Sequence, residues 1–501
     1  MEKGKDKNTE NTPNSLTFLM FPFHYETAAH SASNASLLDF GPDSIWEQSD
    51  AKIENNVMYE YIRPNVESIS TPYLVYSIKK SPESELAKKR INRIWNKINV
   101  QFTSEEKTYR VDFKKENGNW NSARLVISPS TNVGLLCLGV GIKKDKNENN
   151  ENGKDKNKNG IPVDDVVDFS YNIRKIDGQV KLILEGYNTD KSSKGYNETR
   201  QKNLEEIVRT LNSKHLKTGE CQLKDIVTFL LQDIQDVTLF DNGRGHIFNY
   251  FNELRDTGEL TDEDKTNIIH LTRAENKKYQ PLETEFSESG AYTATFRNIY
   301  CGCSTEGGVI YTLRNNSNSD AFISKFPLGA LQHRYLWLYI MALIQRHSLL
   351  RMILMIHNLD ISTFSKEVRK EFNHKYGYLC KIMASGYFSN VSSLAQHNQY
   401  YNFCLRNLQV NSLYDEVSGK MKTLDAYLEL CRNEMQENKA EFQEKIAKIG
   451  LVISVLAGLF ALPQTASALC TQKISFKDYI IPLLIMTPFV ISIFRIWKSK
   501  K

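Results

Sequence analysis

The sequence predicts a mixed α/β (α+β) soluble domain, followed by a long helical stalk and a two-helix membrane hairpin. Three observations carry this prediction. Strand-like apolar runs alternate with amphipathic segments over the N-terminal part of the chain. Apolar and aromatic residues then recur at alternating steps of three and four from Tyr400 to Ile449. No charged residue occurs from Ile449 to Cys470, and a second uncharged run extends from Tyr479 to Phe494.

Composition sets broad limits. The chain has 501 residues, 41% of them hydrophobic and 25% charged, which is ordinary for a soluble protein of two or three domains. Its net charge of +5 does not indicate direct nucleic-acid binding. Residues 1–14 are polar, lack the core of a signal peptide and are expected to form a disordered tail. The eight cysteines are scattered, as in a reducing compartment.

Residues 15–395 are assigned to a cytoplasmic domain. Strands are predicted at 15–25, within 103–142, and at 173–187, 291–300 and 308–313, and helices at 198–211 and 221–232. Residues 328–359 are helical and very apolar, but charged residues recur through them. They are therefore predicted to form a buried helix packed on a sheet rather than a third membrane span.

Two local patterns offer weak metal sites. Cys301-Gly-Cys303 is either half of a metal site or, in the preferred interpretation, two ordinary thiols near a turn. Residues 143–160 are charged and rich in asparagine, which favours a solvated surface loop. Within them, Asp155, Asn157 and Asn159 match the start of a calcium loop, but Val166 stands where its last acidic ligand is expected.

Residues 396–448 are predicted to form a coiled stalk helix because the spacing of three and four is sustained along them. Asn438 occupies a position of this apolar seam, where it either fixes register or faces a wet channel. An acidic set is predicted to form a solvated face: Glu429, Glu434, Glu437, Glu441 and Glu444.

The hairpin is divided into a first transmembrane helix at 449–470, an external loop at 471–478, a second helix at 479–497 and a basic tail at 498–501. Lysines and Arg495 flank its open side, so both termini are expected in the cytoplasm, with the protein in the inner (cytoplasmic) membrane as a multi-pass protein. Small and hydroxylated residues on one stripe favour either close helix packing or a pore lining: Leu451, Ser454, Gly458, Ala461 and Thr465.

From residue 328 to the C-terminus, this order of parts resembles the CorA-type magnesium transporter superfamily. The basic end, Trp497-Lys-Ser-Lys-Lys501, is similar to the terminus of that family. The resemblance implies a funnel-shaped homopentamer in the lipid bilayer. Its pore is then lined by Asn438 and the stripe, and Mg²⁺ is the candidate permeant ion. The family's Gly-Met-Asn signature is absent, and Pro463-Gln-Thr-Ala-Ser-Ala-Leu469 stands in its place. Gln464, Thr465 and Ser467 are the pore-entrance candidates.

The enlarged soluble domain and the missing signature resemble a divergent branch of the superfamily that is encoded beside type III CRISPR systems. That resemblance implies gating by a nucleotide second messenger, an S-adenosylmethionine–AMP conjugate. In Asp241-Asn-Gly-Arg-Gly-His246, Arg244 and His246 are candidate phosphate contacts, and an ordinary turn is the alternative. A second candidate group, whose alternative is structural ion pairing, is His333, Arg334, Arg346 and His347.

Three functions follow as hypotheses. The first is a ligand-gated homopentameric channel acting in antiviral defence, and the second is a housekeeping transporter of Mg²⁺ or Co²⁺. The third is a membrane-tethered nucleotide-processing enzyme. No Walker loop, H-E-x-x-H, G-x-S-x-G or paired cysteine clusters occur. We therefore expect no enzyme activity, no catalytic residues and no required cofactor.

Overall fold

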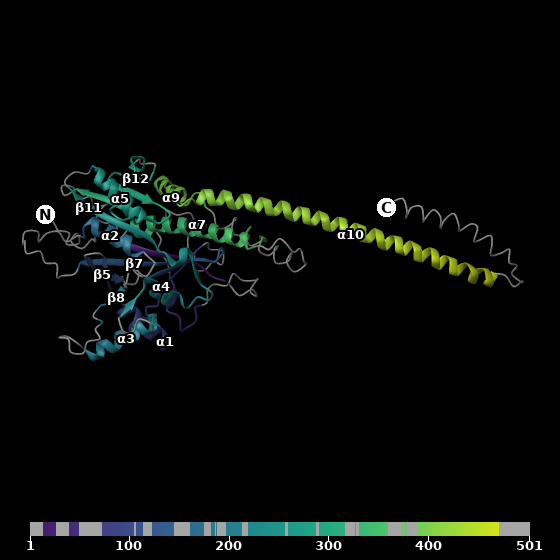
Figure 1. The fold of residues 1–501 in the computed structure, drawn as a ribbon, viewed down its shortest axis with the longest axis horizontal. Coiled ribbons are helices and arrows are strands. Elements are labelled where there is room, and N and C mark those ends of the chain that lie inside the picture. Colours follow the sequence, from purple (N-terminus) through teal and green to yellow (C-terminus); the bar gives the residue numbers. More distant parts are fainter. Residues whose placement is uncertain are drawn as a thin grey trace, which may run out of the picture. The chain divides into compact units, whose positions relative to one another are not determined.

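The structure is a computed structural model of the chain. It describes residues 14–26, 40–49, 73–104, 107–113, 123–144, 161–174, 182–185, 187, 197–212, 219–255, 259–286, 290–315, 326, 330–358, 373, 376–377, 380 and 388–469. Two compact units are distinguished, Met1–Ser418 and Gly419–Lys501. The fold is mixed α/β (Figure 1).

The first unit is built on one sheet of 14 described strands. Ten of them run in the order β12-β13-β14-β11-β1-β7-β5-β4-β8-β9, and β6, β3 and β2 continue from β7, while β10 pairs with β1. The strands are β1 (Ser15–His24), β2 (Trp46–Gln48), β3 (Leu74–Ile78), β4 (Val100–Ser104), β5 (Lys107–Phe113), β6 (Arg124–Ser128), β7 (Val133–Lys144), β8 (Leu182–Leu184), β9 (Glu220–Cys221), β10 (Thr238–Leu239), β11 (His246–Arg255), β12 (Tyr292–Phe296), β13 (Ile299–Cys303) and β14 (Gly307–Asn315).

Helices cover both faces of this sheet. The described α-helices of the whole chain are α1 (Glu85–Lys88), α2 (Val163–Ile173), α3 (Glu198–Asn212), α4 (Leu223–Leu231), α5 (Asp262–Arg273), α7 (Leu336–His357), α9 (Ala395–Asn407) and α10 (Val410–Leu469). In β1, Leu19, Phe21 and Phe23 join the core cluster that holds the buried residues of α2, α4 and α5. The alternate residues of the strand, such as Phe18, point to the opposite face, because side chains alternate along a strand. There α7 contacts β1 and β7.

The predicted elements are largely confirmed, with one strand shortened. Segment 173–187 was expected to be a strand, but its first residue ends α2, and among its described residues only Leu182–Leu184 form a strand. Helix α2 forms there because Val166, Phe169 and Ile173 repeat at three and four residues and are buried together. Strand β7 continues to Lys144, so the predicted loop begins no earlier than residue 145, and residues 145–160 lie outside the described residues.

Helix α7 is the apolar helix predicted to be buried. With the preceding π-helical turn η7 (Leu331–Tyr335), it is the one helix in the described part of the chain that is long and apolar enough to cross a membrane. However, 67% of its most apolar window is buried inside the protein. Aromatic contacts such as Phe248–Tyr339, with ring centroids 4.9 Å apart, tie it to the sheet. The burial agrees with a core helix rather than a membrane span.

Buried Arg351 anchors α7 to the end of the central strands. Its Nη1 donates to the carbonyl oxygens of Tyr25, at 3.0 Å, and of Asn132, and its Nη2 pairs with Glu26 at 3.2 Å. Asn132 has a φ of 49° in the turn that leads into β7. One guanidinium therefore satisfies backbone acceptors at two chain turns.

The predicted stalk helix is divided in two. Residues 396–448 were expected to form one helix, but α9 ends at Asn407 and α10 begins at Val410, with Gln409 at a φ of 57°. No glycine or proline marks this break. Arg346 of α7 donates to the carbonyl oxygen of Leu408 at 2.5 Å, which satisfies an acceptor at the end of α9. Because α9 contacts β12, β13 and α7, it belongs to the unit that contains the sheet.

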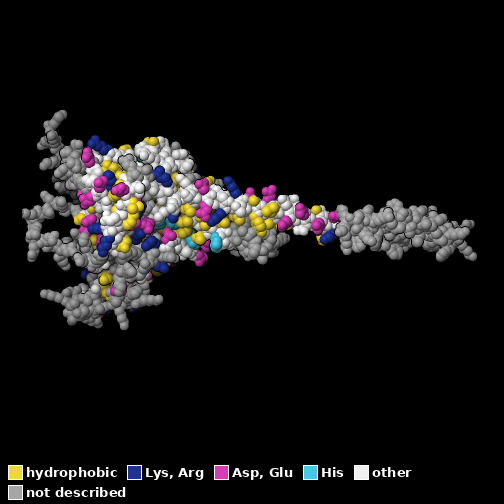
Figure 2. All heavy atoms as spheres, turned by 45° about the horizontal axis from the view of Figure 1, so that its top comes forward, with side chains coloured by type: hydrophobic (Ala, Val, Ile, Leu, Met, Phe, Trp, Pro, Cys, Tyr) yellow, Lys and Arg dark blue, Asp and Glu magenta, His cyan; other side chains and the backbone are white. Residues whose placement is uncertain are grey.

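Helix α10 has 60 residues and is therefore about 90 Å long. It continues through Pro463 to Leu469, and its side chains are described as far as Val455. Seam positions Val417, Leu424, Leu428 and Cys431 are buried, whereas almost every described residue from Arg432 to Ser454 is exposed. Figure 2 shows apolar and acidic side chains interleaved on this exposed helix, and the five predicted acidic residues are among its exposed positions.

Some predicted segments lie outside the described residues. They are residues 1–13 and the loop, second membrane helix and tail predicted at 471–501.

Replacing Arg351 tests how strongly α7 is anchored. The substitution Arg351→Met keeps the apolar stem but leaves buried carbonyls with fewer donors, so it should destabilise the domain by roughly 2–3 kcal/mol. The control Arg297→Met changes an exposed arginine and should stay within about 0.5 kcal/mol of the parent. Denaturant unfolding of the detergent-solubilised chain measures both. Equal stability of the two variants would contradict the anchoring role.

Candidate functional site

Three polar side chains from distant parts of the sequence converge on the α7 face of the sheet. Asp241 lies in the short helix η5 (Phe240–Gly243), His246 begins β11, and His347 lies in α7. The Nε2 atoms of both histidines are 3.8 Å from Asp241 Oδ2. The donor atoms of the three side chains all lie within 4.8 Å of one another. The imidazole rings meet edge to face at 5.2 Å.

Local structure explains why the three residues meet. His246 has the same strand parity as Phe248, so it points toward α7. Asp241 has a φ of 50°, which bends η5 back toward the start of β11, and its carbonyl oxygen accepts from the Arg244 amide at 3.0 Å. Gly245 is required because a side chain there would place Cβ 2.9 Å from the ring of Phe21. The turn can therefore lie directly against β1.

Apolar side chains pack around the imidazole rings of His246 and His347, whereas the Asp241 carboxylate reaches solvent. Phe240 contacts His347, with centroids 4.8 Å apart, and His24, at 5.3 Å. The His246 and His347 side chains are 5% and 0% exposed, but the Asp241 side chain is 54% exposed. The site is thus dry at the imidazoles and reachable by solvent at the carboxylate.

Hydrogen bonding and burial set the protonation states. His347 Nδ1 donates to the carbonyl oxygen of Leu343 at 2.8 Å. Because a carbonyl can only accept, Nδ1 carries a proton, and Nε2 is the ring nitrogen that faces Asp241. Burial lowers the pKa of His246 to about 4, so this ring is neutral at pH 7.

This arrangement directs two imidazole Nε2 atoms and one carboxylate oxygen to one point. At 3.8 Å, the histidine–carboxylate separations are longer than hydrogen bonds. A phosphate at His246 and His347, as predicted from sequence, would meet the Asp241 carboxylate. A cation suits the donor set better, since imidazole nitrogen and carboxylate oxygen are both metal ligands.

The other predicted ligand-binding residues are dispersed. Arg244 is exposed on the same turn, and Arg346 is half-buried and bound to Leu408. His333 and Arg334 lie in η7, roughly 20 Å from His347 along the helix, at about 1.5 Å per residue. The two predicted ligand groups come close to each other at only three of their residues. They are His246 from the turn motif and Arg346 and His347 from the helical group. Asp241 was quoted in the turn motif but was not itself proposed as a ligand, and no pattern in the sequence links it to α7.

The predicted pore residues lie on α10. Asn438, Leu451 and Ser454 have exposed side chains. Gly458, Ala461, Gln464, Thr465 and Ser467 lie in the helical backbone beyond Val455. The weak calcium-loop residues Asp155, Asn157 and Asn159 lie outside the described residues.

The Cys301–Cys303 pair consists of buried free thiols at the end of β13, beside the turn into β14. Gly302 separates them because α5 packs closely here, and an added Cβ would lie 1.9 Å from Thr272 Oγ1. Burial raises the pKa of Cys301, so its thiol stays protonated. This arrangement agrees with ordinary core thiols.

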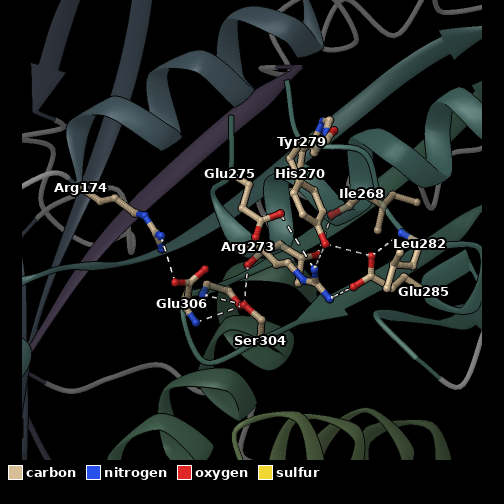
Figure 3. A network of polar contacts seen from close by, with 12 residues as sticks. Arg174, Ile268, His270, Arg273, Glu275, Tyr279, Leu282, Glu285, Ser304 and Glu306 are labelled. Carbon is tan, nitrogen blue, oxygen red and sulfur yellow. Dashed lines mark hydrogen bonds and ion pairs between the residues drawn. The ribbon is translucent and has the colours of Figure 1, made fainter. Parts of the chain in front are cut away.

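A second polar network lies at the end of α5 (Figure 3). Arg273 donates to the Tyr279 hydroxyl at 3.1 Å and pairs with Glu285, and the Tyr279 hydroxyl donates to Glu285 at 3.3 Å. Nearby, Arg174 of α2 pairs with Glu306 at 3.1 Å. These contacts fasten the segment after α5 and the β13–β14 turn to the helices, so we assign the network a structural role.

His397, near the start of α9, should make the stability of the fold depend on pH. Burial, together with the charge of Arg334, lowers its pKa from 6.5 to about 4. The unfolded chain therefore binds more protons between these values, and stability is lost as pH falls from about 6.5 toward 4. The thermal midpoint should drop less between pH 7 and pH 5 in His397→Gln than in the parent. The control His357→Gln, at an exposed histidine, should retain the parental drop, and an unchanged drop in His397→Gln would contradict this assignment.

Comparisons of the chain with protein-family models, with curated proteins and with solved structures each gave no match. Two features of the chain therefore bear on its function. One is the cluster of Asp241, His246 and His347, and the other is the exposed apolar surface of α10.

Proposed function

We propose that this chain is a membrane channel of CorA-like architecture, in which several copies assemble around the first membrane helix. The observation that carries the proposal is the apolar surface at the membrane end of α10. Ile449, Leu451, Val452 and Ile453 are 45–59% exposed. Adjacent residues differ by 100° around a helix, so these four present apolar surface on several sides of it. Lipid or other copies of the chain must cover such a surface.

The exposed part of the seam indicates where copies meet. The seam positions Val417, Leu424, Leu428 and Cys431 are already buried within one chain. Beyond Met435 the seam is open, and Phe442 on it is 64% exposed. Contacts between copies would therefore begin near Met435 and continue into the membrane. A homopentamer is the assembly that the CorA-like order of segments implies.

The soluble domain supplies the signal in this proposal. Its ligand is a nucleotide second messenger, an S-adenosylmethionine–AMP conjugate, and the channel acts in type III CRISPR antiviral defence. The support is the resemblance in segment order together with Pro463–Leu469, which replaces the magnesium-selecting motif. Helix α10 is continuous from Val410 to Leu469, so a single helix leads from the end of the first unit into the proposed membrane segment.

Ion flux in liposomes tests the gating. The reconstituted full-length chain should release trapped ions when the nucleotide conjugate is added and should remain closed without it. Empty liposomes with the conjugate serve as the control. Magnesium flux that proceeds at the same rate without any nucleotide would instead favour a housekeeping Mg²⁺ or Co²⁺ transporter.

Substitution in the open seam tests the assembly. Phe442→Asp places a charge at the proposed contact and should lower the mass of the detergent-solubilised complex toward that of a monomer. Leu430→Asp is the matched control, because Leu430 is 63% exposed on the same helix but lies off the seam. Its complex should keep the parental mass. Loss of assembly in both variants, or in neither, would contradict the proposed interface.

A further inference from the structure

The cluster of Asp241, His246 and His347 is not used by the proposed channel function. It combines two almost completely buried imidazoles with a carboxylate that reaches solvent. Its donor atoms come from a turn, a strand and a helix, and the two histidines are separated by a hundred positions in the sequence. Such convergence within 4.8 Å needs a physical reason, because it desolvates polar groups in the core.

Unsatisfied donor atoms give the first argument for a ligand. His347 Nε2 is buried without a hydrogen-bond partner, and it faces the Asp241 carboxylate at 3.8 Å. Nδ1 of His347 is already bonded to the carbonyl oxygen of Leu343, which leaves Nε2 as the nitrogen that can bind a ligand. A cation held between Nε2 and the carboxylate would give both groups a partner.

The geometry also fits an ion. Metal–nitrogen and metal–oxygen bonds of about 2.0–2.2 Å place neighbouring donors of a tetrahedral site about 3.3 Å apart. The observed 3.8 Å separations are close to this value, and small side-chain rotations would close them. The hydrogen bond from His347 Nδ1 to a backbone carbonyl is the contact that usually orients a metal-binding histidine.

We propose that Asp241, His246 and His347 bind one divalent transition-metal ion of the Zn²⁺ class. Imidazole ligands select Zn²⁺, Ni²⁺, Co²⁺ or Fe²⁺ over Mg²⁺, which prefers oxygen. The exposed side of Asp241 leaves room for solvent to complete the coordination. The ion would join η5, β11 and α7, and so fix the loop before β11 to the core helix. This inference does not depend on the channel function.

Metal content of the full-length chain tests the site. The detergent-solubilised protein is stripped with a chelator, dialysed against Zn²⁺ or Co²⁺, and its bound metal is measured per chain. One ion per chain is expected, with the Co²⁺ form showing visible absorption bands from nitrogen and oxygen ligands. A millimolar excess of Mg²⁺ should displace none of it, and the thermal midpoint should rise when Zn²⁺ is added.

Asp241→Asn is the decisive variant. Asparagine tolerates the left-handed backbone at this position, so the variant should fold while losing the charged ligand, and Zn²⁺ affinity should fall at least tenfold. Asp236→Asn is the matched control, since Asp236 is also exposed and has a φ of 49°. It should bind like the parent. His347→Gln should lose binding as well, and if it does not fold, the asparagine variant decides alone. Absence of stoichiometric metal in the parent, or equal affinity in Asp241→Asn and Asp236→Asn, would overturn the proposal.

Discussion

The burial of α7 is the constraint on which the rest of the sheet-containing unit depends. This helix is apolar on nearly every side, and it is covered by the sheet on one side and by α9 on another. Three of its polar residues link α7 to different parts of the fold. Arg351 holds the turns at the ends of β1 and β7, Arg346 holds the end of α9, and His347 faces Asp241. Core packing therefore fixes the helix break and the polar cluster together.

The two longest helices show how the same apolar character leads to different environments. Helix α7 carries Arg346, His347 and Arg351 among its apolar residues, and most of those apolar residues are buried as far as Met352. The C-terminal end of α10 has no charged residue after Lys448, and the apolar side chains of Ile449, Leu451, Val452 and Ile453 are exposed. Exposed apolar surface of this kind is typical of a site that contacts lipid or another protein chain.

Much of this fold could be predicted from local patterns. Continuous apolar runs marked β1 and β7, and recurrent charges within an apolar helix marked α7 as a core element. The division between α9 and α10 could not be predicted, because a tertiary contact from Arg346 to Leu408 stabilises a break in a sequence that lacks glycine and proline. The sequence predicted two of the three residues of the candidate site, and it placed them in separate groups. His246 and His347 each stood in a proposed ligand group, but the strand parity of β11 and the placement of α7 on the sheet decide that they meet, with Asp241 between them.

The central claim is that the segment from Ile449 onward is inserted in a lipid bilayer. Alkaline carbonate extraction of membranes from cells that express the chain tests this claim most directly. The full-length chain should remain in the membrane pellet, and a chain truncated before Ile449 should move to the supernatant. Recovery of the full-length chain in the supernatant, as a folded soluble species, would contradict the account.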